Sequence, residues 1–166
     1  MIPMTKPCPP TPPDSALTLD AQLCFALYSA HLAMGKVYRR FLADLGLTYP
    51  QYLVMLVLWE SDGLSVTSLG ERLYLDSATL TPLLKRLQAL GLLRRDRDTE
   101  DQRQVRACLT QAGQDLKRRA RAIPQGVMCA TGCAPGHARV LKAELEELRA
   151  HLQGAIAITE KQGAPT

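Results

Sequence analysis

The chain contains 166 residues, of which 46% are hydrophobic and 22% are charged. These values are typical of a soluble protein with a hydrophobic core, and the length fits one compact domain with an added dimerisation region. Aromatic residues make up only 5%, so leucine and alanine must fill most of the core, which favours helices. The formal charge of +4 permits nucleic-acid binding without requiring it.

The sequence also predicts several absences. No apolar stretch approaches the roughly 20 residues that span a bilayer, and the first residues lack the apolar core of a secretion signal, so we expect a cytoplasmic protein with no membrane association. Five cysteines, an odd number, argue against a structural disulfide set: Cys8, Cys24, Cys108, Cys129 and Cys133. The last two lack the C-x-x-C spacing and a nearby histidine cluster, so we expect no metal site and no cofactor.

The N-terminal part of the chain predicts a tail followed by two helices. Residues 1–16 hold six of the 11 prolines and predict a disordered tail. Apolar residues recur every three or four positions over 17–45, which predicts a long helix ending near Gly46. Thr48 and Gln51 then form a capping-box pair for a second helix. Its run 52–59 is apolar on nearly every side, which predicts burial.

The later elements predict a mainly α (α+β) fold, a winged helix-turn-helix. They are helices over 66–73 and from Asp76 or Ser77 to Leu90, strands over 92–95 and 104–109, a helix from Thr110 through Arg119, and a last helix over about 135–156. Pro124 and Gly126 are expected to interrupt the helix before the last one and to loosen the stretch that follows. We assign 49–109 to the DNA-binding module, 17–48 and 110–156 to a helical dimerisation region, and 157–166 to a flexible tail.

The helix that begins at Asp76 or Ser77 has the pattern of a recognition helix. Leucines form one apolar face for packing. Small hydroxyl side chains in the first turns suit contacts with base edges, and the cations that follow suit contacts with phosphates. The candidate DNA-binding residues of this helix are Ser77, Thr79, Thr81, Lys85 and Arg86.

The predicted hairpin supplies the wing. Its tip, 96–103, is charged and lacks large apolar residues; Arg95, Arg97 and Arg103 are candidates for groove and phosphate contacts. Four acidic residues lie there too, so an isolated hairpin of this composition would more simply be a solvated turn. The preceding hydroxyl-rich helix favours DNA binding instead.

The run 90–103, LGLLRRDRDTEDQR, resembles the wing signature of the MarR family of bacterial transcription regulators. The resemblance extends from about Leu19 to Leu152 and implies an obligate homodimer in which the first and last helices of two subunits intertwine. It implies that Asp101 and Arg103 occupy wing positions, with the arginine reaching the minor groove of operator DNA.

Two segments, 23–30 and 47–53, resemble the organic hydroperoxide resistance regulators of that family. In that branch the cysteine matching Cys24 senses peroxide, tyrosines matching Tyr38 and Tyr49 donate hydrogen bonds to it, and one matching Tyr28 approaches from the other subunit. The two-cysteine class of the branch implies that Cys129 resolves the oxidised thiol of the opposite subunit.

The chemistry of the residues agrees with a sensor. A thiol attacks peroxide as the thiolate, which needs a pKa below the usual value of about 8.5 and hydrogen-bond donors for the anion. Fourteen residues, about four helical turns, separate Cys24 from Tyr38, so the two meet only across two chains. The alternative is that Cys24 is a small core residue. Cys133 stays open as the resolving thiol, Cys108 is expected to pack, and Cys8 is incidental.

Three other functions stay open at this point. A phenolic or drug-like ligand could release a regulator of this type, with Cys24 incidental. A thiol peroxidase could use Cys24 with a resolving thiol, although the basic wing argues for DNA and against an enzyme. The third is a structural dimer with no role on DNA.

Overall fold

The computed structural model describes residues 17–97 and 104–162, and side chains as far as residue 158. The predicted tail 1–16 with Cys8, and the tip of the wing with Asp101 and Arg103, lie outside the described residues. The chain divides into two compact units, Met1–Ala120 and Arg121–Thr166. The helix after the wing packs with the first unit.

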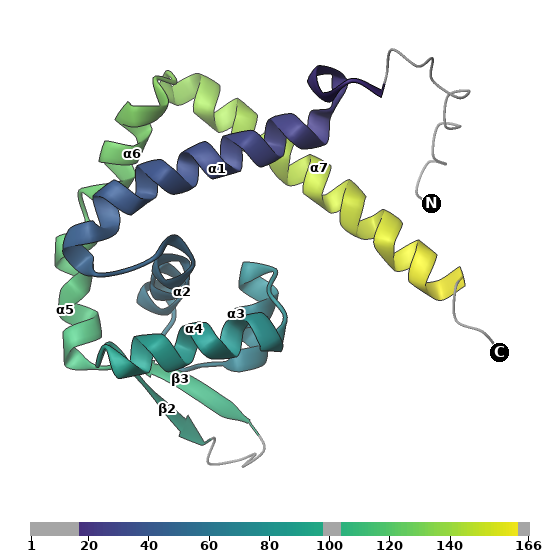
Figure 1. Cartoon of the computed structure of the whole chain (residues 1–166). Helices are drawn as coiled ribbons and strands as arrows, with labels where there is room; N and C mark the ends of the chain where they lie inside the picture. The colour runs from purple at the N-terminus through teal and green to yellow at the C-terminus, as the bar shows by residue number, and fades with distance from the viewer. Residues whose placement is uncertain (1–16, 98–103, 163–166) are drawn as a thin grey trace. The chain divides into compact units, whose positions relative to one another are not determined.

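The first unit is a winged helix-turn-helix preceded by a long helix (Figure 1). Its elements are η2 (Leu19–Ala21), α1 (Leu23–Leu42), η3 (Ala43–Leu45), α2 (Tyr49–Glu60), β1 (Leu64–Ser65), α3 (Val66–Leu73), α4 (Ser77–Ala89), β2 (Leu93–Arg97), β3 (Val105–Leu109) and α5 (Gln111–Ala120). The strands form an antiparallel sheet in the order β1-β3-β2. The predicted mainly α winged helix-turn-helix is confirmed; the two-residue strand β1 was not predicted.

The central helix α2 carries the core. Its capping box is formed as predicted, and Gln51 Oε1 accepts the Thr48 N–H at 2.8 Å. Tyr52, Val54, Met55 and Leu58 are almost fully buried, as expected for a helix that is apolar on nearly every side. Leucines of α3 and α4 bury their apolar faces in the same core: Leu69, Leu80, Leu84 and Leu87.

Helix α5 is the last element of the first unit, and its backbone at Gly113 packs closely against the backbone at Leu92. A Cβ at Gly113 would lie 2.0 Å from the carbonyl oxygen of Leu92, so only glycine fits there. The Gly113 carbonyl accepts the indole N–H of Trp59 at 2.9 Å. These contacts fix α5 against both α2 and the start of β2.

The second unit contains α6 (Ile123–Thr131) and α7 (Pro135–Gln162). The predicted interruption near Pro124 is confirmed, since α5 ends at Ala120 and α6 begins at Ile123, but the prediction of a loosened stretch after it was wrong. Pro124 lies in the first turn of α6, where a missing N–H costs nothing, and Gly126 donates to the Ala122 carbonyl at 3.0 Å. Helix α7 also continues to Gln162, so 157–162 are helical rather than part of the predicted tail.

Among the described residues, no single helix is long and apolar enough to cross a membrane. Only the pair Leu23–Leu45 and Tyr49–Glu60, bent by 66°, meets the length and composition criteria together.

Candidate functional site

The recognition helix α4 begins at an aspartate cap. Asp76 Oδ1 accepts the backbone N–H of Thr79 at 2.6 Å, and this hydrogen bond, together with one from the Thr79 side chain, lowers the pKa of the Asp76 carboxyl. The cap places Ser77 and Thr79 in the exposed first turn. The predicted hydroxyls therefore lie at the solvent-facing start of the helix.

The turn before α4 depends on a close approach and a left-handed residue. A Cβ at Gly70 would lie 2.6 Å from the Leu75 carbonyl oxygen, so a side chain there would push α3 and α4 apart. Tyr74 has φ +56°, and its backbone N–H caps α3 on the Glu71 carbonyl. Left-handed non-glycine residues are uncommon and are found in tight turns.

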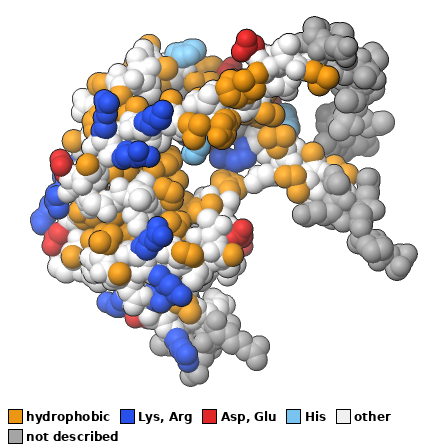
Figure 2. Space-filling model, viewed as in Figure 1, with side chains coloured by type: hydrophobic (Ala, Val, Ile, Leu, Met, Phe, Trp, Pro, Cys, Tyr) orange, Lys and Arg blue, Asp and Glu red, His pale blue; other side chains and the backbone are white. Residues whose placement is uncertain are grey.

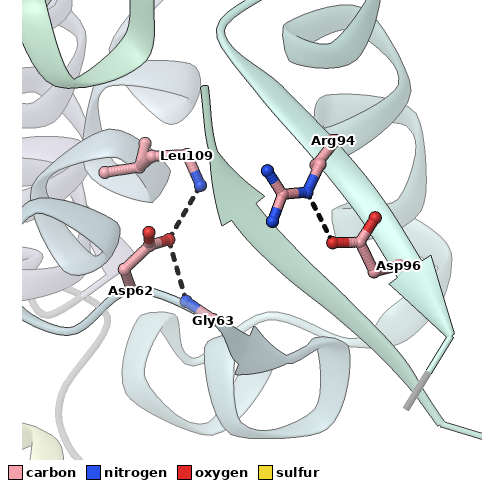
Figure 3. Close-up of polar contacts among 5 residues, drawn as sticks. All are labelled: Asp62, Gly63, Arg94, Asp96 and Leu109. Carbon is pink, nitrogen blue, oxygen red and sulfur yellow. Dashed lines mark hydrogen bonds and ion pairs between the residues drawn. The ribbon is translucent and has the colours of Figure 1, made fainter. Parts of the chain in front are cut away.

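The sheet presents its basic side chains on two faces. Arg95 and Arg97 are two residues apart on β2 and share one face, because side chains alternate along a strand. Arg95 Nε donates to Gln88 Oε1 of α4 at 2.7 Å, which ties the wing to the recognition helix. Arg94 lies on the opposite face and pairs with Asp96 at 2.6 Å (Figure 3).

Asp62 connects the base of the wing to the end of α2 through hydrogen bonds (Figure 3). Its Oδ1 accepts two backbone N–H groups, from Gly63 and from Leu109 at the end of β3, both at 2.8 Å. This role of Asp62 was not predicted from the sequence. The Asp-Gly pair in the sequence could have indicated it, because an aspartate side chain before glycine commonly accepts a hydrogen bond from a backbone N–H of its own turn.

A hollow of about 300 Å³ lies where the recognition helix meets the wing. Ser77 and Thr81 of α4 line it together with Arg95 of β2 and Gln104. Lysine and arginine side chains gather over α4 and the hairpin on the face in Figure 2. The structure thus brings these predicted DNA-binding residues of helix and wing to one surface.

The remaining candidate residues lie beside that surface. Lys85, Arg86 and Arg97 are exposed, while the Thr81 hydroxyl donates to the Ser77 carbonyl at 2.7 Å. That bond uses the Thr81 proton and leaves the oxygen as an acceptor. Asp101 and Arg103 lie outside the described residues.

Cys24 is exposed at the start of α1, so it is not a core residue of the single chain. Tyr28, four residues later on the same side of the helix, is 59% exposed. Leu23 and Leu32 are also largely exposed, and Figure 2 shows hydrophobic side chains over this half of α1. The thiol therefore lies among exposed apolar side chains of α1.

The other two predicted tyrosines pack on each other at the far end of α1. The ring centroids of Tyr38 and Tyr49 are 4.2 Å apart, and Tyr52 lies next to Tyr38 at 6.0 Å. Burial, then the neighbouring phenols Tyr49 and Tyr52, raise the pKa of Tyr38 to about 12; burial also raises the pKa of Tyr49. Both phenols therefore keep their protons at neutral pH and are hydrogen-bond donors.

Within one chain this phenol pair is far from Cys24. Fourteen residues of continuous helix separate Cys24 from Tyr38, a rise of about 21 Å. The structure therefore divides the predicted sensor into two halves, a thiol at one end of α1 and a phenol pair at the other. The resemblance implies that Tyr28 approaches from the other subunit, whereas within one chain Tyr28 already lies one helical turn from Cys24.

The other described cysteines have different surroundings. Cys108 of β3 is half-buried, and burial, followed by Asp96 and Asp62, raises the pKa of its thiol. Cys129 is exposed on the last turn of α6, which ends at the left-handed Gly132. Cys133 is half-buried, and its backbone N–H donates to the Thr131 hydroxyl at 3.2 Å. Among the described residues, no group of histidine, cysteine and carboxylate side chains is suited to a metal ion.

Comparison with known proteins identifies the family. A model of the MarR family matches residues 47–105. The transcriptional regulator TtmR of Methylorubrum extorquens is 50% identical over 151 residues, 91% of this chain and 77% of TtmR. The chain belongs to the MarR family. It is a MarR-family transcriptional regulator, and these relatives are regulators rather than enzymes.

Two further comparisons concern redox regulators. The organic hydroperoxide resistance transcriptional regulator of Bacillus subtilis is 48% identical over 112 residues, 68% of this chain and 76% of that protein. Reduced AbfR bound to DNA, a structure at 36% identity, has a TM-score of 0.70 and covers 83% of this chain and 94% of its own. AbfR is also solved overoxidised on DNA (TM-score 0.67) and with a disulfide formed (TM-score 0.57). DNA binding by the MarR fold agrees with the helix and wing described above.

Replacing Asp76 with asparagine tests the recognition-helix cap. Asparagine caps helices as well as aspartate but does not titrate. Because the pKa of Asp76 is lowered in the folded chain, its carboxylate stabilises the fold above the unfolded pKa of about 3.9, and this contribution is lost as the pH falls through the folded value. Urea midpoints should favour the unmodified protein over Asp76→Asn at pH 7, and the difference should shrink as the pH falls below the unfolded pKa and Asp76 becomes protonated. A difference that stays constant from pH 7 to pH 3 would contradict this assignment.

Proposed function

We propose that the protein is a redox-sensing repressor that binds operator DNA as a homodimer in the cytoplasm. Organic hydroperoxide oxidises Cys24, a disulfide with Cys129 of the partner subunit follows, and the dimer leaves the DNA. The observation that carries this proposal is the division of the sensor on α1. An exposed Cys24 and a protonated Tyr38–Tyr49 pair about 21 Å apart on one chain complement each other only across two chains.

The uncovered apolar surfaces support the dimer. Leu23 and Leu32 on α1 are 61% and 46% exposed, and large apolar side chains are exposed along α7 of the second unit: Val140, Leu141, Leu145, Leu152, Ile156 and Ile158. Exposed apolar area on this scale is typical of protein–protein interfaces. In the proposal, the segments 17–48 and 110–156 form the dimerisation region, and 49–109 forms the DNA-binding module.

Chemically, the sensor works in two steps. The Cys24 thiolate attacks the terminal oxygen of the hydroperoxide, an S–O bond forms, the O–O bond breaks, and the alkoxide leaves with the electron pair and takes a proton from solvent. This produces a sulfenic acid and an alcohol. The partner's Cys129 thiol then attacks the oxidised sulfur, and water leaves as the disulfide forms. The phenols of Tyr38 and Tyr49, and Tyr28 at the seam, stabilise the thiolate by donating hydrogen bonds.

The disulfide, rather than oxidation alone, is proposed to release DNA. AbfR has been solved overoxidised and still bound to DNA, as well as with a disulfide formed. Exposure favours Cys129 over the half-buried Cys133 as the resolving thiol. The raised pKa of Cys108 makes that thiol a poor nucleophile.

Cys24→Ser tests the sensor directly. The variant should bind operator DNA as tightly as the unmodified protein in a gel shift, yet stay bound after cumene hydroperoxide, whereas the unmodified dimer should lose about 100-fold or more in affinity. Release of Cys24→Ser by the peroxide would disprove the sensor, and release by a salicylate-like compound would indicate a ligand-responsive regulator. Repeated turnover of peroxide with a thiol reductant would indicate a peroxidase.

The matched variants Cys129→Ser and Cys133→Ser identify the resolving thiol after the same peroxide treatment. Non-reducing electrophoresis after peroxide should show a covalent dimer in the unmodified protein and in Cys133→Ser and Cys108→Ser, but not in Cys129→Ser. A covalent dimer lost only in Cys133→Ser would reassign the resolving role to Cys133.

Tyr49→Phe tests the phenol pair. Phenylalanine keeps the ring that packs on Tyr38 and removes only the hydroxyl. A hydrogen bond to a charged group contributes about 1.5–3 kcal/mol, so oxidation of Cys24 at pH 7 should slow about tenfold or more. Stopped-flow oxidation by cumene hydroperoxide measures the rate. Tyr74→Phe, which removes a surface phenol in the turn before α4, serves as the control and should leave the rate unchanged; equal rates in both variants would exclude Tyr49 from the sensor.

Arg97→Ala and Arg94→Ala test which face of the wing meets DNA. Arg97 is exposed on the face that Arg95 shares, whereas Arg94 pairs with Asp96 on the other face. Losing one phosphate contact should lower the slope of log affinity against log salt by about 0.9 in Arg97→Ala. The slope should stay the same in Arg94→Ala. A larger loss of slope in Arg94→Ala would reverse the proposed orientation of the wing.

A further inference from the structure

A third phenol lies next to the phenol pair of Tyr38 and Tyr49. Tyr52 follows Tyr49 by three residues on α2, so the two side chains share one face of that helix. The ring of Tyr52 also lies beside Tyr38 of α1, with 6.0 Å between the two centroids. Tyr52 is only 2% exposed, whereas Tyr38 and Tyr49 are half-buried. A molecule that arrives from solution therefore reaches the phenol pair more readily than it reaches Tyr52.

The hydroxyl of Tyr52 is unusual for a buried tyrosine. Buried tyrosine hydroxyls normally have a hydrogen-bond partner. Within the described part of the chain, however, the Tyr52 hydroxyl makes no hydrogen bond. In the same residues no buried side-chain oxygen or nitrogen is both sealed from solvent and without a partner. The Tyr52 oxygen therefore lies in the small part of the residue that still reaches the surface.

Together the three hydroxyls form a group of neutral donors without an acceptor. Burial, followed by the nearby Tyr49, raises the pKa of Tyr52, and Tyr52 in turn contributes to the raised pKa of Tyr38. All three phenols therefore keep their protons at neutral pH. Among the described residues none of the three donates to a carbonyl, a carboxylate or another phenol. Because a phenol can both donate and accept, such a group can share its hydrogen bonds with an anion supplied from outside the chain.

Resting on the proposed function, we infer that Tyr52 is a positioning residue of the sensor, which orients the Tyr38 hydroxyl toward the thiolate of Cys24 of the partner subunit. The Tyr52 hydroxyl donates to the Tyr38 oxygen, and the Tyr38 hydroxyl then donates to the sulfur. Hydrogen bonds in such a chain polarise one another, so Tyr38 becomes a stronger donor to the anion. Tyr52 does not touch the sulfur, and the oxidation step is the one given above.

Tyr52→Phe tests this inference, because phenylalanine keeps the buried ring and removes only the hydroxyl. The net contribution of a hydrogen bond between neutral groups is modest, so stopped-flow oxidation of Cys24 by cumene hydroperoxide at pH 7 should slow about two- to tenfold. Since the thiolate loses stabilisation, the pH at which the rate reaches half its maximum should rise by up to about one unit. The rates of the variant and the unmodified protein should converge at alkaline pH, where the thiol is ionised in both.

A role of Tyr52 in the packing of the core alone predicts a different result. It would slow oxidation by the same factor at every pH or weaken DNA binding by the reduced variant, and either outcome would overturn the inference. Reduced Tyr52→Phe should instead bind operator DNA as tightly as the unmodified protein in a gel shift. Tyr74→Phe, which removes a surface phenol, is the control and should leave the pH profile of oxidation unchanged.

A double-mutant cycle with Tyr38→Phe distinguishes positioning from direct contact with the sulfur. If Tyr52 acts through Tyr38, the double variant should oxidise no more slowly than Tyr38→Phe alone. The full slowing by Tyr52→Phe in that background, or an unchanged rate in Tyr52→Phe at every pH, would overturn the inference. Failure of cumene hydroperoxide to oxidise Cys24 in the unmodified protein would instead overturn the proposed function.

Discussion

The fixed length of α1 is the constraint on which the proposed sensor depends. A continuous helix cannot shorten, so Cys24 near its start and Tyr38 near its end stay about 21 Å apart in every folded copy of the chain. Any activation of Cys24 by the phenol pair is therefore intermolecular. A chain that failed to dimerise would carry an exposed thiol with only Tyr28 beside it on the helix. In the proposed function, sensing therefore requires the dimer.

Hydrogen bonds connect the end of α1 to the recognition helix and the wing within the first unit. Arg119 of α5 donates to the Asp44 carbonyl in η3, directly after α1, and Lys117 donates to the Trp59 carbonyl at the end of α2. Asp62 then fastens β3 to the turn after α2, and Gln88 binds Arg95 across α4 and β2. Because close-packed interiors transmit strain rather than absorb it, a displacement of α1 is expected to reach the recognition helix and wing.

The sequence predicted best those features that depend on local chemistry. The capping box at Thr48 and Gln51 is formed, and Asp76, one of the two residues predicted to begin α4, is its cap. The stretch after Pro124 was mispredicted because a proline can either break a helix or occupy the first turn of a new one. Which of the two occurs depends on where the preceding helix ends.

Features that depend on tertiary contacts could not be predicted. The strand β1 is two residues long and exists only because Leu64 and Ser65 pair with β3. The stacking of Tyr38 on Tyr49 joins two helices and exists only because α1 and α2 pack together. Periodicity identified the residues on each helix but carried no information on which helix faces would meet.

In the proposed mechanism, thiol chemistry and DNA binding are linked through α1, and the linkage is reciprocal. If the disulfide form binds operator a hundredfold less tightly, bound operator opposes closure of the disulfide by the same factor, about 2.7 kcal/mol. Formation of the sulfenic acid changes one exposed side chain and leaves the packing of α1 on α2 as it was. The two steps are thus coupled to DNA differently. The surroundings of Cys24 set the rate at which peroxide oxidises the thiol. The free energy needed to move α1 when the disulfide forms sets how completely the dimer leaves the operator.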